Sequence, residues 1–116
     1  MKKVNTNNFK KTLSKFSTGI TVVCVKNNNS IYGKTVNSFN SLSLNPPMVL
    51  FSLGNYSSSI KKFSKTKFLS INILSSKQKK LSDNFALTEP NLEDIKFIEG
   101  KNKTVIMPNC IANLEC

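Results

Sequence analysis

Apolar residues recur along the chain with two spacings, one typical of helices and one typical of strands. Near the N-terminus, three apolar residues are spaced as on one face of a short helix: Phe9, Leu13 and Phe16. Asn7 or Asn8 is suited to cap the start of this helix, and Gly19 is suited to end it. We therefore expect an N-terminal helix with these residues at core-like positions.

Strand-like patterns dominate the rest of the chain. ITVVCVK is rich in β-branched residues and almost unbroken, as in a strand that is buried on both faces. The turn NNNS leads to its partner strand, and two prolines precede the next one. Strands are expected at 20–26, 31–39, 48–53, 68–74, 104–107 and 110–116.

Two short helices are expected between these strands. One spans 60–65 and can be capped by the serines before it, and the other spans 77–86, where Leu81 and Phe85 lie four residues apart. The stretch 87–103 is polar and is expected to be a loop. Without a repeat or linker, residues 1–116 are expected to form a single domain, a small antiparallel barrel or sheet with peripheral helices.

The net charge of the chain predicts attraction to phosphate groups but does not identify the ligand that carries them. The net charge is +11, from 17 basic residues, all lysine, and six acidic residues. Such a field attracts nucleic acid, nucleotide cofactors or acidic membranes. The lysines are scattered over the whole chain, which favours a solvated basic exterior.

Histidine is absent, which removes Ser-His and Cys-His catalysis and the usual nitrogen ligand of zinc. The cysteines have no CxxC spacing, and Cys24 lies in an apolar run where a buried thiol is expected. No apolar run approaches the roughly 18 residues of a membrane helix, and no apolar segment follows the basic N-terminus. We expect a cytoplasmic protein without a metal.

The stretch GKTVNSFNSLSLNPPMVLFSL (33–53) carries many hydroxyl and amide groups but no carboxylate. If it is extended, one side of the strand presents Thr35, Asn37, Phe39, Ser41 and Ser43. Such a surface suits a flat, neutral ligand with many hydrogen-bond acceptors. The alternative is that these residues only form turns and cross-strand pairs.

A second polar cluster precedes the helix expected at 60–65. Ser57, Ser58 and Ser59 offer hydroxyls at the helix start, and two lysines follow at once. Hydroxyls and free N–H groups at a helix start can bind phosphate. A helix cap is the alternative, although it requires only one serine.

Five segments occur in the order and spacing seen in the flavin reductase family of FMN-binding split barrels. They are FKKTLSKFSTGITVV, GKTVNSFNSLSLNPPMVLFSL, the serine cluster, FLSINIL and LSDNFA. The chain resembles this family from Phe9 to about Ala86, and more faintly at CIANLEC (110–116).

The resemblance implies a mainly β fold, an antiparallel, Greek-key-like FMN-binding split β-barrel with short peripheral helices. It implies a homodimer that binds FMN or FAD near the subunit interface, takes hydride from NADH or NADPH and passes reduced flavin to a partner, often an oxygenase. The two cofactors carry this chemistry while the protein binds and orients them, so no catalytic residue is assigned. No nucleic-acid or membrane partner is expected.

The resemblance also implies groups of flavin-binding residues. The group at the ribityl chain and ring edge is Thr35, Asn37 and Ser38, and the group at the bend beside the ring is Ser41 and Ser43. The phosphate-side loop is Ser57, Ser58 and Ser59. Weaker family positions are matched by Asn72, Asn84 and Phe85.

The family continues beyond the strand that begins near Cys116, so we expect a barrel that is incomplete at its C-terminus. We also expect flavin binding to be better retained than catalytic turnover. Two alternatives remain open. One is a flavin-binding protein without reductase activity. The other is a basic small barrel that binds single-stranded nucleic acid, which the core-like phenylalanine positions disfavour.

Overall fold

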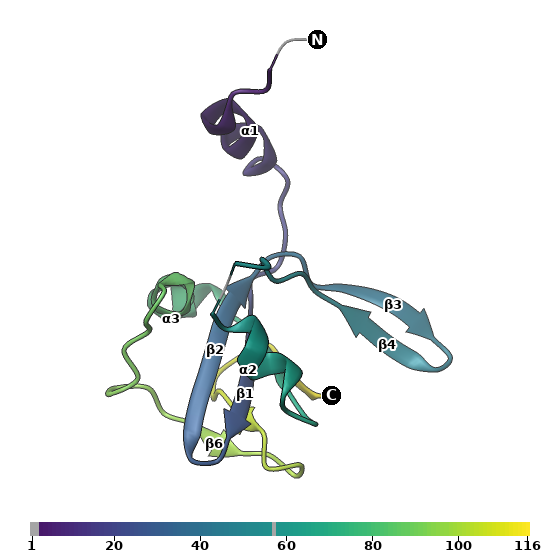
Figure 1. Cartoon of the computed structure of the whole chain (residues 1–116), viewed down its shortest axis with the longest axis vertical. Helices are drawn as coiled ribbons and strands as arrows, with labels where there is room; N and C mark the ends of the chain where they lie inside the picture. Colours follow the sequence, from purple (N-terminus) through teal and green to yellow (C-terminus); the bar gives the residue numbers. More distant parts are fainter. Residues whose placement is uncertain (1–2, 57) are drawn as a thin grey trace.

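The computed structural model describes residues 3–56 and 58–116. Its main element is an antiparallel sheet with the strand order β2–β1–β5–β8 (Figure 1). The bounds of these strands are Thr21–Asn27 for β1, Ser30–Val36 for β2, Ser70–Ile73 for β5 and Ala112–Glu115 for β8. β1 therefore pairs on both sides, whereas β2 forms one edge of the sheet.

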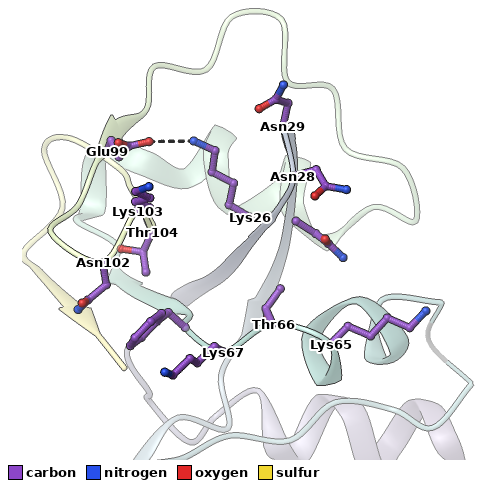
Figure 2. Close-up of a pocket in the computed structure, with 12 residues that line it drawn as sticks. Lys26, Asn28, Asn29, Lys65, Thr66, Lys67, Glu99, Asn102, Lys103 and Thr104 are labelled. Carbon is purple, nitrogen blue, oxygen red and sulfur yellow. Dashed lines mark hydrogen bonds and ion pairs between the residues drawn. The ribbon is translucent and has the colours of Figure 1, made fainter.

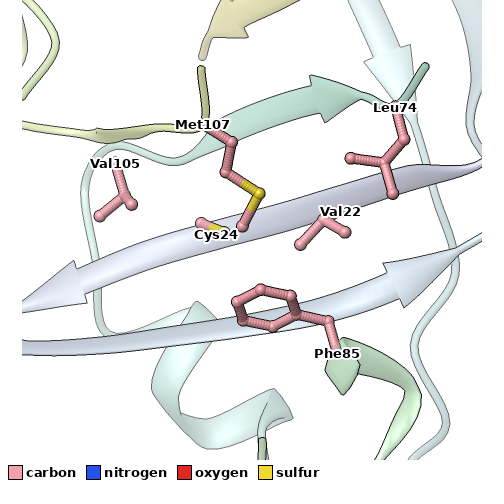
Figure 3. Packing of buried hydrophobic residues seen from close by; sticks show 6 residues of the cluster. All are labelled: Val22, Cys24, Leu74, Phe85, Val105 and Met107. Carbon is pink, nitrogen blue, oxygen red and sulfur yellow. The ribbon is translucent and has the colours of Figure 1, made fainter. Parts of the chain in front are cut away.

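Strand β1 is buried on both faces, as predicted from its unbroken apolar run. Residues 21–25 are all buried. One face packs the cluster drawn in Figure 3, which consists of Val22, Cys24, Leu74, Phe85, Val105 and Met107. The other face packs Val23, Val25, Val36, Phe63 and Ile71. Alternate residues of β1 thus supply two separate parts of the core.

One helix covers each of these faces. Helix α2 (Ile60–Ser64) contributes Phe63 to one cluster, and α3 (Lys79–Ala86) contributes Phe85 to the other. The short helix η1 (Ser76–Gln78) leads into α3, and the Ser75 N–H donates to Gln78 Oε1 at 2.9 Å. Both helices were predicted from the sequence, and their positions are confirmed.

The polar stretch 87–103 is mostly a loop, as predicted, but it contains one short strand. Strand β6 (Ile98–Glu99) pairs with β7 (Val105–Ile106), which lies inside the strand expected at 104–107. A strand of only two residues has no recognisable periodicity in the sequence, so β6 is identified only by its pairing with β7.

The prediction for residues 40–53 is partly wrong. Strands β3 (Asn40–Leu44) and β4 (Pro47–Leu50) form a hairpin with a register shift between Ser41 and Ser43. The sequence predicted a bend over the first of these strands and a longer second strand. The ladder forms because the turn places the two segments opposite each other, which overrides the weak strand preference of serine and asparagine. Figure 1 shows this hairpin projecting from the body of the molecule.

The N-terminal helix exists, but its predicted ends and its packing are wrong. Helix α1 spans Thr6–Leu13, and Asn5 caps it by accepting from two backbone N–H groups. It ends well before Gly19. Its apolar residues Phe9 and Leu13 are 52 % and 54 % accessible, and Phe16, which follows the helix, is 76 % accessible. In Figure 1 α1 stands away from the sheet, so within the described residues no core is available to cover it.

The fold is therefore mainly β with a few short helices. The strands form three separate sheets among the described residues, and the largest is open at β2 and β8. No described helix is both long and apolar enough to cross a membrane.

Candidate functional site

A cleft runs along the free edge of β2 and consists of two chambers. The larger, of about 440 Å³, lies beside Thr35, and its opposite wall consists of Ser52, Leu53, Gly54, Tyr56, Ser58 and Ser59. The smaller, of about 210 Å³, lies beside residues 31–33. Three hydroxyl residues line both chambers and are called the waist: Ser58, Ser59 and Thr88.

Strand pairing explains why the cleft opens on the edge of β2. The Leu74 N–H donates to Ile20 O at 2.9 Å, so alternate residues of β1 beginning at Ile20 bond to β5 and the intervening ones bond to β2. It follows that the backbone N–H and C=O groups of Ile31, Gly33 and Thr35 point away from the sheet. These groups form the floor of the cleft.

Side-chain hydrogen bonds hold one wall of the cleft against β2. Thr35 Oγ1 donates to Ser82 O at 2.6 Å, and Lys34 Nζ donates to Leu87 O at 3.0 Å. The Asn84 amide donates to Asn91 O at 2.7 Å and accepts from the Asn91 N–H at 3.0 Å. These bonds fix the 87–91 segment that carries Thr88.

The opposite wall depends on Ser38. Its Oγ accepts from the Ser52 N–H at 2.8 Å, which holds the segment after β4 close to the end of β2. Ser38 therefore supports the cleft from outside, whereas Ser52 lines the larger chamber.

The structure brings only some predicted site residues together. Thr35, Ser58 and Ser59 line the cleft, and Ser57 lies outside the described residues. Asn37, Ser41 and Ser43 line neither chamber. The extended run that a continuous polar side over 35–43 requires is not present, because β2 ends at Val36 and β3 begins at Asn40.

Two further predicted residues are buried in the core. Asn72 and Phe85 both have 0 % exposure, and the ring of Phe85 packs against Gly33. Their suggested contacts with flavin remain predictions, but their contacts in this chain are structural.

Sequence reasoning missed several residues of the cleft. Thr88 falls in the stretch expected to be a loop, and no local pattern connects it with β2. Lys62 was noted only as one of two lysines after the serines, yet its Nζ lies 3.8 Å from the centre of the Tyr32 ring, beside the smaller chamber. Only the folded chain distinguishes it from Lys61.

The polar groups of the cleft suit a neutral ring that carries phosphate. The larger chamber has hydroxyls and one cation, Lys34, and no carboxylate among its described lining residues. The smaller has Lys62 and one carboxylate, Glu89. Such groups bind and orient a ligand, while acid-base catalysis by this set is not expected.

The predicted burial of Cys24 is confirmed. Its exposure is 0 %, and burial, with a smaller effect of nearby Cys110, raises the pKa of the thiol to about 12. The thiol is therefore protonated at neutral pH and acts as a small apolar group in the cluster of Figure 3.

A second hollow, of about 550 Å³, lies at the turn between β1 and β2 and contains none of the predicted site residues. Lys26 Nζ and Glu99 Oε2 lie 2.9 Å apart, and this hydrogen bond lowers the pKa of the Glu99 carboxyl. Figure 2 shows the other lysine side chains pointing in different directions, with Lys65 directed away from the ion pair. The lysines therefore do not converge on one ligand position.

Comparison with known proteins gives a consistent result. The family model described as flavin reductase like domain matches residues 13–116. The FMN reductase (NADH) SmoA of Agrobacterium fabrum is 35 % identical over 112 residues, which cover 97 % of this chain and 64 % of that protein. The reductase subunit HsaB of a flavin-dependent monooxygenase of Mycobacterium tuberculosis is 31 % identical over 109 residues, which cover 93 % and 58 %.

A solved structure extends this similarity to the fold. The NADH:FAD oxidoreductase of Streptomyces globisporus, in complex with NAD and FAD fragments, matches with a TM-score of 0.86 and 26 % identity. The match covers 100 % of this chain and 73 % of that one. The chain spans about three fifths of the length of the two curated relatives.

Proposed function

Because the chain belongs to the flavin reductase-like family, we propose that it binds FMN or FAD and reduces it with NADH or NADPH. The observation that carries this proposal is the cleft on the edge of β2, which combines outward backbone groups, hydroxyls and a lysine without a carboxylate in its larger chamber. When bound, the flavin supplies the acceptor for hydride from the nicotinamide.

The residues of the cleft fit a flavin by their chemistry. The outward N–H of Thr35 is a donor for the oxygen and nitrogen atoms of the ring edge. The hydroxyls of the waist, Ser58, Ser59 and Thr88, together with Lys34, are donors for the phosphate. Their role is to hold and orient the flavin, and the walls exclude water from part of it.

We further propose a homodimer and a split β-barrel. Three predicted site residues that the cleft leaves out, Asn37, Ser41 and Ser43, lie near exposed apolar surface. Asn37 shares a hollow with Phe16, and the hairpin with Ser41 and Ser43 exposes Leu44. A second copy that covers this surface brings those residues to an interface. We also propose an oxygenase as acceptor of the reduced flavin, as the name of the HsaB relative suggests.

Neither alternative has a specific observation in its favour. The lysines beside the second hollow diverge, so this hollow offers nucleic acid no continuous basic track (Figure 2). A flavin-binding protein without reductase activity has the same cleft, so only turnover distinguishes it.

The test removes hydroxyls from the waist. FMN titration followed by quenching of flavin fluorescence should saturate, and Ser58→Ala or Thr88→Val should weaken binding about fivefold, since each loses about 1 kcal/mol of hydrogen bonding. Ser76→Ala is the control, because Ser76 is exposed at the start of η1 and lines neither chamber.

Oxidation of NADH or NADPH in the presence of excess FMN or FAD, followed at 340 nm, tests reduction. Absence of saturable binding of either flavin by folded protein would overturn the whole proposal. Saturable binding without oxidation of either coenzyme would leave a binding protein and overturn the reductase activity.

A further inference from the structure

The two chambers are arranged in line along β2 rather than side by side. Thr35 borders the larger and Ile31 the smaller, and four residues of a strand span about 13 Å. The waist lies between them, because Ser58, Ser59 and Thr88 line both. A ligand that passes the waist therefore continues into the smaller chamber.

This arrangement separates a mononucleotide from a dinucleotide. With the flavin ring in the larger chamber and its phosphate at the waist, FMN ends at the waist. FAD carries a second phosphate, a ribose and an adenine beyond that point. Resting on the proposed function, we propose that the smaller chamber binds the adenylate half of a dinucleotide, and that this dinucleotide is FAD.

The lining of the smaller chamber suits each part of an adenylate. The outward N–H groups of Ile31 and Gly33 and the Lys62 ammonium are donors for the second phosphate. Glu89 is the one carboxylate among the described lining residues and suits the ribose hydroxyls, which donate hydrogen bonds. Pro90 and Leu92, which also line the chamber, offer apolar surface to the base.

Lys62 is held at this chamber by its neighbour. Its ammonium lies over the Tyr32 ring at 3.8 Å, and an ammonium in that position is attracted to the ring face. Tyr32 itself lies on β2 and is half-buried, so the sheet fixes the position of the ring that Lys62 contacts. Neighbouring Lys61 is exposed and lines neither chamber.

The nicotinamide coenzyme also carries an adenylate, so the experiment must separate the two sources. Dissociation constants of FMN, FAD and AMP are measured by calorimetry for the wild type, Lys62→Gln and the control Lys61→Gln. The KM for NADH is measured with FMN as acceptor. Thermal unfolding of each variant verifies that it is folded.

We expect the wild type to bind FAD more tightly than FMN and to bind AMP. Lys62→Gln should raise the dissociation constants of FAD and AMP about fivefold, which is the effect of losing one charge-assisted hydrogen bond near the surface. It should change the dissociation constant of FMN less than twofold. Lys61→Gln should change none of them.

Each other outcome contradicts the inference in a recognisable way. If Lys62→Gln weakens the binding of FMN and FAD equally, or weakens the binding of neither, the smaller chamber is not an adenylate site. The proposed flavin binding then still stands. If the KM for NADH rises but FAD affinity is unchanged, the adenylate belongs to the coenzyme, and the assignment to FAD is overturned. If neither flavin binds, this inference and the proposed function both fail.

Discussion

Asn72 illustrates how a single buried polar residue can hold several segments of the chain together. Its amide nitrogen donates to Val22 O at 3.1 Å and to Ser70 Oγ at 3.4 Å. Its amide oxygen accepts from the Met107 N–H at 2.9 Å and from Asn113 Nδ2 at 2.7 Å. The full hydrogen-bonding capacity of the side chain is thus used inside the protein.

We expect Asn72→Leu to lower the free energy of unfolding by about 2–4 kcal/mol, because the buried Met107 N–H loses its partner. Asn113→Ala is the matched comparison and should cost about 1 kcal/mol, since Asn113 is partly exposed. Urea unfolding measures both. Equal losses would contradict the central role of Asn72, and a folded, stable Asn72→Leu that no longer binds flavin would make Asn72 a ligand contact instead.

At the scale of the elements, β2 and α3 are in close contact at Gly33. A Cβ atom at this position would lie 2.6 Å from two ring atoms of Phe85, which is fully buried. Glycine here permits close packing of the helix on the strand, and that packing places the C-terminal end of α3 beside the cleft wall that carries Thr88.

Gly33→Ala should therefore lower the free energy of unfolding by about 1–3 kcal/mol through overpacking, although alanine is otherwise no worse than glycine in a strand. Phe85→Leu in the same chain should recover part of that loss, because a smaller side chain makes room for the methyl group. Chemical denaturation of the two single variants and the double variant measures the coupling. Strict additivity of the two losses would show that the contact is not the cause.

At the scale of the whole molecule, α1 and the β3–β4 hairpin extend away from the body (Figure 1). Both expose large apolar side chains, with Leu44 of the hairpin 93 % and Leu13 of α1 54 % accessible. Exposed apolar surface of this kind is typical of protein interfaces. This is the physical basis for the proposed homodimer.

We expect the wild type to be a dimer by sedimentation or light scattering, and Leu44→Glu to raise the dimer dissociation constant at least about tenfold, or about 1.4 kcal/mol. Ile98→Glu is the control, since Ile98 is also an exposed apolar residue (56 %) but lies on β6, outside α1 and the hairpin. A monomeric wild type at micromolar concentration, or equal dissociation of both variants, would remove the support for this interface.

Much of the sheet could be predicted because its signals are local. The β-branched run of β1 and the four-residue spacing of Leu81 and Phe85 each lie within one element, so they identify that element without reference to the rest of the chain. The same local reasoning failed for α1. Its stripe has helical spacing, but spacing does not tell whether another surface is present to cover it.

The sequence by itself determined the two helices that cover the sheet, the approximate positions of the strands of the main sheet and the family that the chain resembles. It also determined that the polar stretch 33–53 carries hydroxyl and amide groups but no carboxylate. Only the tertiary structure decided where the cleft lies. Its floor exists because β2 is an edge strand, and strand order depends on contacts between distant segments. For the same reason Thr88 and Lys62 become part of the site, since each is brought to β2 by hydrogen bonds and ring contacts that no local pattern encodes.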